Sequence, residues 1–144
     1  MKMIDVGDKE KTERVARATA HLSMKPATVR LLRSGRVEKG NAVEAARLAA
    51  VMAAKKTPDL IPLCHPLALT SVKCEIKLQA RGVAVTVEVK TRDRTGVEME
   101  ALVAASTAAL TLYDMLKSVD RGMRIERLQL EEKAGGRSGR WVRT

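Results

Sequence analysis

Alternating apolar and polar residues in the middle of the chain predict a β-hairpin. Over residues 72–78 every second side chain is apolar, and the same period of two recurs over residues 83–89. Because side chains of a strand point alternately to its two faces, each segment has one apolar and one polar face. Arg81 and Gly82 lie between the segments, as is typical of a tight turn. We therefore expect two antiparallel strands here.

Apolar residues at helical spacing predict two helices before this hairpin. Pro26 is expected to open a short helix over residues 27–33, because proline is tolerated in the first helical turn. Asn41 is a candidate N-cap for a second helix over residues 42–56, since its side chain can accept a backbone N–H. Pro58 is expected to stop that helix, because proline removes a helical hydrogen bond.

A third and longer helix is predicted from about residue 97 to 119. The residues expected on or near its apolar side are Met99, Leu102, Val103, Ser106, Leu110, Tyr113 and Leu116. Further strands are expected at about 18–24 and 123–132, followed by a flexible glycine-rich tail from about residue 135. The order β-α-α-β-β-α-β predicts a single α+β domain over residues 1–144, a ferredoxin-like antiparallel sheet with helices packed on one face.

The composition restricts the core, the partners and the location. Phe is absent, and Tyr113 and Trp141 are the only aromatic residues, so Ala, Val, Leu, Ile and Met must build the core. Alanine-rich helices leave shallow faces that other subunits can cover. The chain has 27 Lys and Arg against 17 Asp and Glu, and this formal charge of +10 favours an anionic partner. With neither a secretory signal nor 18 consecutive apolar residues, we expect a cytoplasmic protein without a membrane segment.

Asp114 and Lys117 form the first candidate for chemistry. They are three residues apart near the end of the long helix, so both project from one face. A carboxylate beside an ammonium can transfer protons when the lysine is desolvated or crowded by other cations, because both effects favour its neutral form. The same spacing is also that of an ordinary surface ion pair, which contributes only ~0.3–0.5 kcal/mol. The spacing alone leaves both interpretations open.

The second candidate is the proline-rich loop over residues 59–67, which contains Leu63, Cys64 and His65. Its two prolines, Pro62 and Pro66, disfavour regular structure and hold His65 ready to hydrogen-bond a ligand. Cys64, His65 and Cys74 match no usual zinc spacing and lack a fourth ligand, so no metal site is expected. The alternative is a Cys64 that faces the core.

The third candidate is the start of the long helix. Thr95 can cap the helix, and the negative charge of Glu98 is favourable in the first helical turn. A structural role is therefore sufficient to explain both residues. Glu100 is less fully explained by capping. A carboxylate can also accept the ring N–H and exocyclic amine protons of a guanine-like ring.

The fourth candidate is positive charge spread over the chain. The glycine-rich segment 133–139, which includes Lys133 and Arg137, can present backbone N–H groups and cations to phosphate, although it lacks the P-loop spacing. A flexible basic tail explains the same residues.

Taken together, these segments resemble a known family over nearly the whole chain. The segments that carry the resemblance are Met-Ile-Asp-Val at 3–6, Leu-Ile-Pro-Leu-Cys-His-Pro at 60–66, Thr-Gly-Val-Glu-Met-Glu-Ala-Leu at 95–102 and Tyr-Asp-Met at 113–115. They are similar to the cyclic pyranopterin monophosphate synthases of molybdenum cofactor biosynthesis. The resemblance implies a lyase that converts 3′,8-cyclo-7,8-dihydro-GTP to cyclic pyranopterin monophosphate and releases pyrophosphate.

The resemblance also implies roles for individual residues. Asp114 and Lys117 match the acid–base pair of the family. The residues that match its substrate-binding positions are Leu63, Cys64, His65, Met99, Glu100, Lys39, Lys133, Arg14 and Arg17. It further implies no metal or organic cofactor, and a homohexamer, a trimer of dimers, with the active site at a subunit boundary.

The alternative from another class is an RNA-binding ferredoxin-like module, which the charge of +10 permits. Such sheets stack bases on aromatic side chains, and the predicted strands contain none. We therefore expect a small nucleotide substrate and no nucleic acid.

Overall fold

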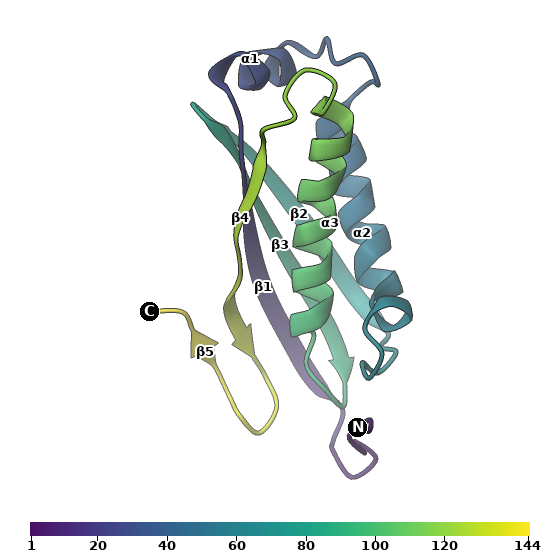
Figure 1. The fold of residues 1–144 in the computed structure, drawn as a ribbon. Coiled ribbons are helices and arrows are strands. Elements are labelled where there is room, and N and C mark those ends of the chain that lie inside the picture. Colours follow the sequence, from purple (N-terminus) through teal and green to yellow (C-terminus); the bar gives the residue numbers. More distant parts are fainter.

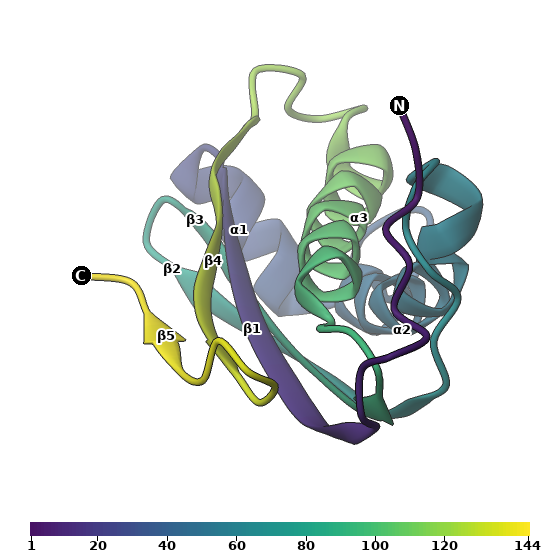
Figure 2. The ribbon, with the colours of Figure 1, turned by 90° about the horizontal axis from the view of Figure 1, so that it is seen from below.

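The computed structural model describes all residues from 1 to 144. Its elements in chain order are β1 (Thr12–Ser23), α1 (Pro26–Ser34), α2 (Ala42–Leu60), β2 (Leu69–Gln79), β3 (Gly82–Asp93), α3 (Glu98–Leu116), β4 (Arg124–Ala134) and β5 (Trp141–Val142). The sheet has the strand order β2-β3-β1-β4-β5, and every neighbouring pair is antiparallel. All three helices lie on one side of the sheet (Figures 1 and 2), which confirms the predicted α+β ferredoxin-like fold.

The core lies between the sheet and the helix layer and is built almost wholly from small aliphatic residues. In β1 the alternate residues from Ala16 to Leu22 are buried, and in β3 those from Val83 to Val89 are buried. These positions face the helices because alternate side chains of a strand share a face. The expected core of Ala, Val, Leu, Ile and Met is confirmed.

α2 and α3 lie side by side and antiparallel (Figure 1), and most of the buried residues of both helices are alanines. The buried alanines are Ala42, Ala46, Ala50, Ala53 and Ala54 in α2 and Ala101, Ala104, Ala105, Ala108 and Ala109 in α3. Because alanine has a single methyl group, two helices lined with it can approach closely. The predicted apolar side of α3 was wrong in part: Leu116 is buried and Leu102 and Tyr113 pack against the core, but Met99 and Leu110 are exposed.

α3 is also long and apolar enough to span a membrane, judged by length and composition alone. In the folded chain 44% of its apolar window is buried, and the core helix of a soluble protein passes the same test. This observation is weak evidence for a membrane segment.

Two predicted boundaries were wrong. β1 begins at Thr12 rather than near residue 18, because its polar first half pairs with β3 on one side and with the end of β4 on the other. α2 continues past Pro58 to Leu60. Pro58 has no N–H to donate to Ala54 O, but the last turn is still closed by the hydrogen bond from Ile61 N to Thr57 O at 2.9 Å. The predicted Asn41 cap is confirmed, since its side chain accepts from Glu44 N at 3.1 Å.

The glycine-rich tail folds back along the sheet. Trp141 and Val142 form β5 and pair with Lys133 and Glu132 of β4. Trp141 is therefore an aromatic residue in a strand, which the sequence analysis did not expect. It lies at the sheet edge, with the Arg143 guanidinium 5.5 Å from its ring centre.

Candidate active site

Asp114 accepts hydrogen bonds from two lysines at the C-terminal end of α3. Lys39 Nζ lies 3.1 Å from Asp114 Oδ2, and Lys117 Nζ lies 3.1 Å from Asp114 Oδ1. Lys39 Nζ also donates to the backbone carbonyl of Asp114 at 3.0 Å. Lys117 is placed by the helical i, i+3 spacing, as predicted, whereas Lys39 comes from the loop between α1 and α2. Sequence spacing gave no signal that Lys39 meets Asp114.

These contacts make the Asp114 end a solvent-exposed cationic cluster. The hydrogen bond from Lys39 is the largest cause that lowers the pKa of Asp114, followed by the hydrogen bond from Lys117. All three side chains are about half exposed, so they are open to a ligand from solution. One carboxylate between two ammonium groups leaves a net positive charge, which suits an anionic substrate.

Glu100 lies at the other end of α3 and is 1% exposed. It borders a cavity of about 520 Å³ together with Leu63, Cys64, His65 and Met99. The structure therefore brings together all five residues that the sequence analysis placed in the proline-rich loop and the start of the long helix. Cys64 faces this cavity and Glu100, and it lies outside the main core cluster.

Only one oxygen of the Glu100 carboxyl group has a hydrogen-bond partner in the protein. The Cys64 thiol donates to Glu100 Oε1 at 3.6 Å, while the buried Oε2 has no hydrogen-bond partner. Burial is the main cause that raises the pKa of Glu100, because a charged carboxylate is costly away from water. Burial also raises the pKa of the Cys64 thiol to about 11, and the nearby Glu100 charge adds to this effect. A ligand that reaches Oε2 would complete its hydrogen bonding.

Sequence reasoning missed part of this cavity. The N-terminal segment lines it through Lys2, Ile4, Val6 and Lys9. The signal was present in the sequence, since Met3, Ile4 and Val6 are apolar residues among charged ones. The proposed cap was also wrong, because Val97 is the N-cap residue of α3 and no side-chain hydrogen bond caps the helix.

Arg14 lies at the start of β1, where the tail closes over it. Its guanidinium donates to the backbone carbonyls of Asp93 at 2.9 Å and Arg94 at 3.2 Å. A Cβ atom at Gly135 would lie 2.2 Å from the backbone carbonyl oxygen of Glu13, so only glycine fits where the tail crosses β1. Arg14 also borders a second cavity, of about 570 Å³, which has no apolar lining residue and includes Lys9 and Arg137.

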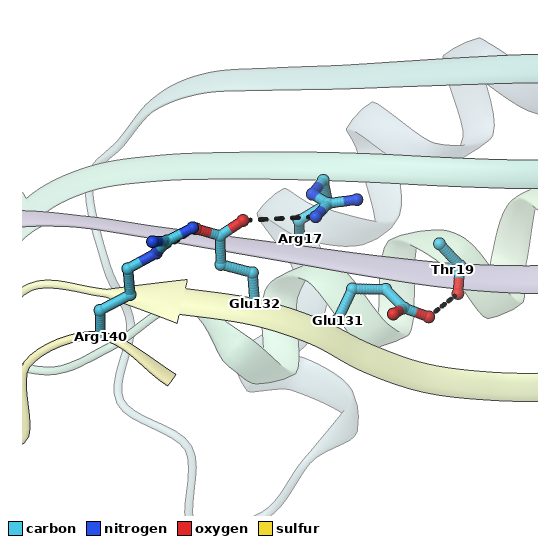
Figure 3. A network of polar contacts seen from close by, with 5 residues as sticks. All are labelled: Arg17, Thr19, Glu131, Glu132 and Arg140. Atoms are coloured by element: carbon cyan, nitrogen blue, oxygen red, sulfur yellow. Dashed lines mark hydrogen bonds and ion pairs between the residues drawn. The ribbon is translucent and has the colours of Figure 1, made fainter. Parts of the chain in front are cut away.

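Arg17 lies on the face of the sheet opposite the helices. Glu132 lies between Arg17 and Arg140 (Figure 3), with Oε2 3.3 Å from Arg17 Nη2 and Oε1 2.8 Å from Arg140 Nε. Nearby, the Thr19 hydroxyl donates to Glu131 Oε1 at 2.7 Å. The hydrogen bonds from Arg140 and Arg17 are the main causes that lower the pKa of Glu132. Lys133 lies near the end of β4, where its ammonium contacts the Ser138 hydroxyl of the tail. In this chain Arg17 is thus paired with a carboxylate rather than free.

The candidate residues therefore form separate groups in one chain. Glu100 and Asp114 are fourteen residues apart on α3, which separates them by about 21 Å along the helix axis. Arg14 and Lys133 lie at the same end of the sheet as Glu100, at the beginning of β1 and the end of β4 (Figure 1). No group of three or more His, Cys, Asp or Glu side chains is placed to hold a metal ion.

The fold and these two groups define an α+β protein with an acid–base cluster and a separate carboxyl-lined cavity on one long helix. Comparison with known proteins matches residues 3–136 to the model of the MoaC family. The chain is 54% identical to a protein of Thermomicrobium roseum over 99% of this chain and 87% of the relative. It is 55% identical to one from a Methylobacterium species, over 97% and 89% of the two chains. A third, from Streptomyces coelicolor, is 50% identical over 99% and 84%.

All three relatives are named cyclic pyranopterin monophosphate synthase. The chain belongs to the MoaC family. The comparisons give no support for the RNA-binding alternative.

Proposed function

We propose that this chain is a cyclic pyranopterin monophosphate synthase of molybdenum cofactor biosynthesis, acting on 3′,8-cyclo-7,8-dihydro-GTP. The observation that carries the proposal is the Asp114 carboxylate held between Lys39 and Lys117 in a chain of the MoaC family. The reaction opens and rebuilds a ring, closes a cyclic phosphate and releases pyrophosphate. These steps move protons and need no change of oxidation state, so an acid–base cluster is suited to them.

Lys117 is the principal acid–base group in this proposal. Asp114 orients its ammonium and shares protons with it, which the 3.1 Å contact supports. Lys39 holds the other carboxylate oxygen, so it fixes the Asp114 side chain and adds a cation beside the substrate. Positive charge at this point stabilises the phosphate oxygens as pyrophosphate leaves.

Glu100 and its cavity hold the base of the substrate in this proposal. The unpartnered Oε2 can accept a hydrogen bond from the donor edge of a guanine-like ring. His65 hydrogen-bonds and polarises the substrate, and Leu63, Cys64 and Met99 contact it. The buried location makes each such hydrogen bond costly to leave unmade, which favours ligands that match it.

Arg14, Arg17 and Lys133 are proposed to bind the triphosphate. Arg14 and Lys133 are supported by their position where the tail meets the sheet, close to the second, polar cavity. Arg17 needs its ion pair with Glu132 to open before it can bind phosphate. The protein is proposed to be cytoplasmic and to work without a metal or organic cofactor.

The active site is proposed to be shared between subunits of a homohexamer, a trimer of dimers. The about 21 Å between Glu100 and Asp114 supports this, because one compact substrate cannot contact both from the same chain at close range. Each site then combines Asp114 and Lys117 of one subunit with the Glu100 cavity of another.

Subunit complementation tests this arrangement. Lys117→Ala and Glu100→Ala proteins should each be inactive, and mixed assemblies should regain activity because some sites then receive neither substitution. Product formation after verified subunit exchange is the measurement. Two Lys117→Ala preparations carrying different tags provide the control and should stay inactive. Absence of regained activity in verified hybrids would contradict a shared site.

A further inference from the structure

Thr91 lies at the end of the buried row of β3. The inward-facing residues of this strand are Val83, Val85, Val87 and Val89, and Thr91 continues their alternation. Thr91 is 2% exposed. A buried hydroxyl is costly unless it is hydrogen-bonded, so a fifth valine would suit the core better. The hydroxyl of Thr91 therefore needs an explanation that the four valines do not.

The Thr91 hydroxyl holds the end of the proline-rich loop. It donates to the backbone carbonyl of Ala68 at 2.6 Å. β2 begins one residue later, at Leu69, which pairs with Thr91, and the register shifts between Leu69 and Ser71. Ala68 thus lies just before the strand ladder begins, and a side chain of β3 supplies the donor for its carbonyl.

Asp93 makes a second contact with Ala68 and connects it to Arg14. Asp93 Oδ2 accepts from the Ala68 N–H at 3.5 Å, which is a weaker contact than that of Thr91, and Oδ1 accepts from the Arg94 N–H at 2.8 Å. The backbone carbonyls of Asp93 and Arg94 in turn accept from the Arg14 guanidinium. The last residues of β3 and the one that follows therefore hold both the end of the loop and Arg14.

The hold on Ala68 reaches His65 through a short and stiff piece of chain. Pro66 fixes its own φ and restricts the backbone of His65 before it. Only one residue lies between Pro66 and Ala68. On the other side of His65, Cys64 N donates to Ile61 O at 3.1 Å. The backbone is thus held on both sides of His65, and Thr91 provides the hold on the C-terminal side.

We infer that Thr91 is a positioning residue, which keeps His65 at the Glu100 cavity by holding the Ala68 carbonyl. The inference rests on the proposed function, in which His65 hydrogen-bonds and polarises the substrate. His65 borders the cavity but Thr91 does not, so Thr91 acts only through the loop. Asp93 supports the same hold and keeps the loop in a fixed relation to Arg14.

Two substitutions separate the hydroxyl of Thr91 from its shape. Thr91→Val keeps the size of the side chain and removes the donor, whereas Thr91→Ser keeps the donor and removes a buried methyl group. Thr91→Val should reduce kcat/KM about 10-fold or more, because a small misplacement of a substrate-contacting group is that costly. Thr91→Ser should keep kcat/KM near the wild-type value, although the lost methyl group lowers its melting temperature.

The matched control makes the same change on the other face of the strand. Thr86 alternates with Val85 and Val87, so Thr86→Val should leave kcat/KM unchanged. A role of Thr91 in packing alone predicts the opposite order, with Thr91→Ser less active than Thr91→Val. That order, or near-normal turnover of Thr91→Val, would overturn the inference.

The alkylation rate of Cys64 reports on the loop without any substrate. Cys64 precedes His65 and contacts Glu100 through its thiol. A loop that is no longer held at Ala68 should expose this thiol more often, so Thr91→Val should accelerate its alkylation by iodoacetamide severalfold at pH 8. Cys74, within β2, is the internal control, and Thr91→Ser should match the wild type at both thiols. No acceleration at Cys64 in Thr91→Val, or equal acceleration at both thiols, would overturn the inference.

These measurements separate the inference from the proposed function. The wild-type protein incubated with 3′,8-cyclo-7,8-dihydro-GTP tests the function alone, and Cys64 alkylation tests the hold on the loop alone. An active wild-type protein whose Thr91→Val variant shows wild-type alkylation would retain the function and overturn the inference. Accelerated Cys64 alkylation in Thr91→Val without any wild-type product would overturn the function and retain the hold of Thr91 on the loop.

Discussion

The two ends of α3 place carboxyl groups in opposite environments. At the first turn, Glu100 is buried beside Cys64, and burial raises its pKa. At the last turn, Asp114 is exposed between Lys39 and Lys117, and their hydrogen bonds lower its pKa. One continuous helix of 19 residues carries both groups.

The difference shows how environment, rather than residue type, assigns a chemical role. The exposed carboxylate stays charged and holds two ammonium groups in place. Burial disfavours the charged form of the Glu100 carboxyl, and one of its oxygens has no hydrogen-bond partner. Pairs of acids with pKa values shifted apart are a common feature of active sites. The helix between them fixes their separation at about 21 Å along its axis within one chain.

The largest expected effect lies at the exposed end. Lys117→Ala should reduce kcat about 100-fold or more, because proton transfer by a positioned side chain contributes at least that much. The melting temperature should stay nearly unchanged, since the side chain is half exposed. Lys55→Ala, an exposed lysine of α2, is the matched control and should keep normal turnover. Near-normal turnover of Lys117→Ala would contradict the proposed acid–base role of Lys117.

A smaller effect should appear in the pH dependence of stability, with opposite sign at the two ends. The folded pKa of Glu100 is raised above 4.5, so its charged form destabilises the fold increasingly as pH rises above about 4.5. Glu100→Gln should therefore raise the melting temperature more at pH 8 than at pH 4. The measurement is thermal unfolding at both values. A gain that does not grow with pH would contradict burial as the dominant influence on Glu100.

The folded pKa of Asp114 is lowered below 3.8, so its stabilising contribution is present above about 3.8 and is lost as pH falls through the folded value. Asp114→Asn should therefore lower the melting temperature slightly at pH 7 and less at pH 3. This change should be smaller than that for Glu100, because solvent screens an exposed ion pair. A loss that increases toward low pH would contradict the assignment.

The smallest expected effect concerns the thiol beside Glu100. The Glu100 charge helps to raise the pKa of Cys64, so Glu100→Gln should increase the alkylation rate of Cys64 severalfold at pH 8. Cys74 is an internal control, because its pKa is also raised by burial but not by Glu100. Mass spectrometry of labelled peptides gives both rates. Equal acceleration of both thiols would indicate general loosening rather than a specific Cys64–Glu100 contact.

Much of the fold could be predicted from local pattern. The hairpin followed from a period of two, and the Asn41 cap and the Pro26 start of α1 followed from residue type. The apolar side of α3 could be predicted only in part, because five alanines share its buried side with Leu112 and Leu116, while Met99 and Leu110 are exposed. Close packing against α2 selects alanine for the inner side, and a hydrophobicity pattern gives such small residues little weight.

The contacts of the candidate site are likewise of two kinds: local ones, which the sequence predicts, and long-range ones, which it does not. The i, i+3 contact between Asp114 and Lys117 is local and followed from the sequence. The contact of Lys39 with Asp114 joins residues 75 positions apart, and the Cys64–Glu100 contact joins residues 36 apart. Such contacts depend on how the elements pack, so no spacing rule could predict them.

The sequence by itself determined the element order, the ferredoxin-like fold, the family resemblance and the list of candidate site residues. Only the tertiary structure decided which of them meet. It buried Glu100, left Asp114 exposed between two lysines, and paired Arg17 with Glu132 on the far face of the sheet. The physical reason is that backbone periodicity is encoded locally, whereas burial and charge pairing arise from segments that come together only when the chain folds.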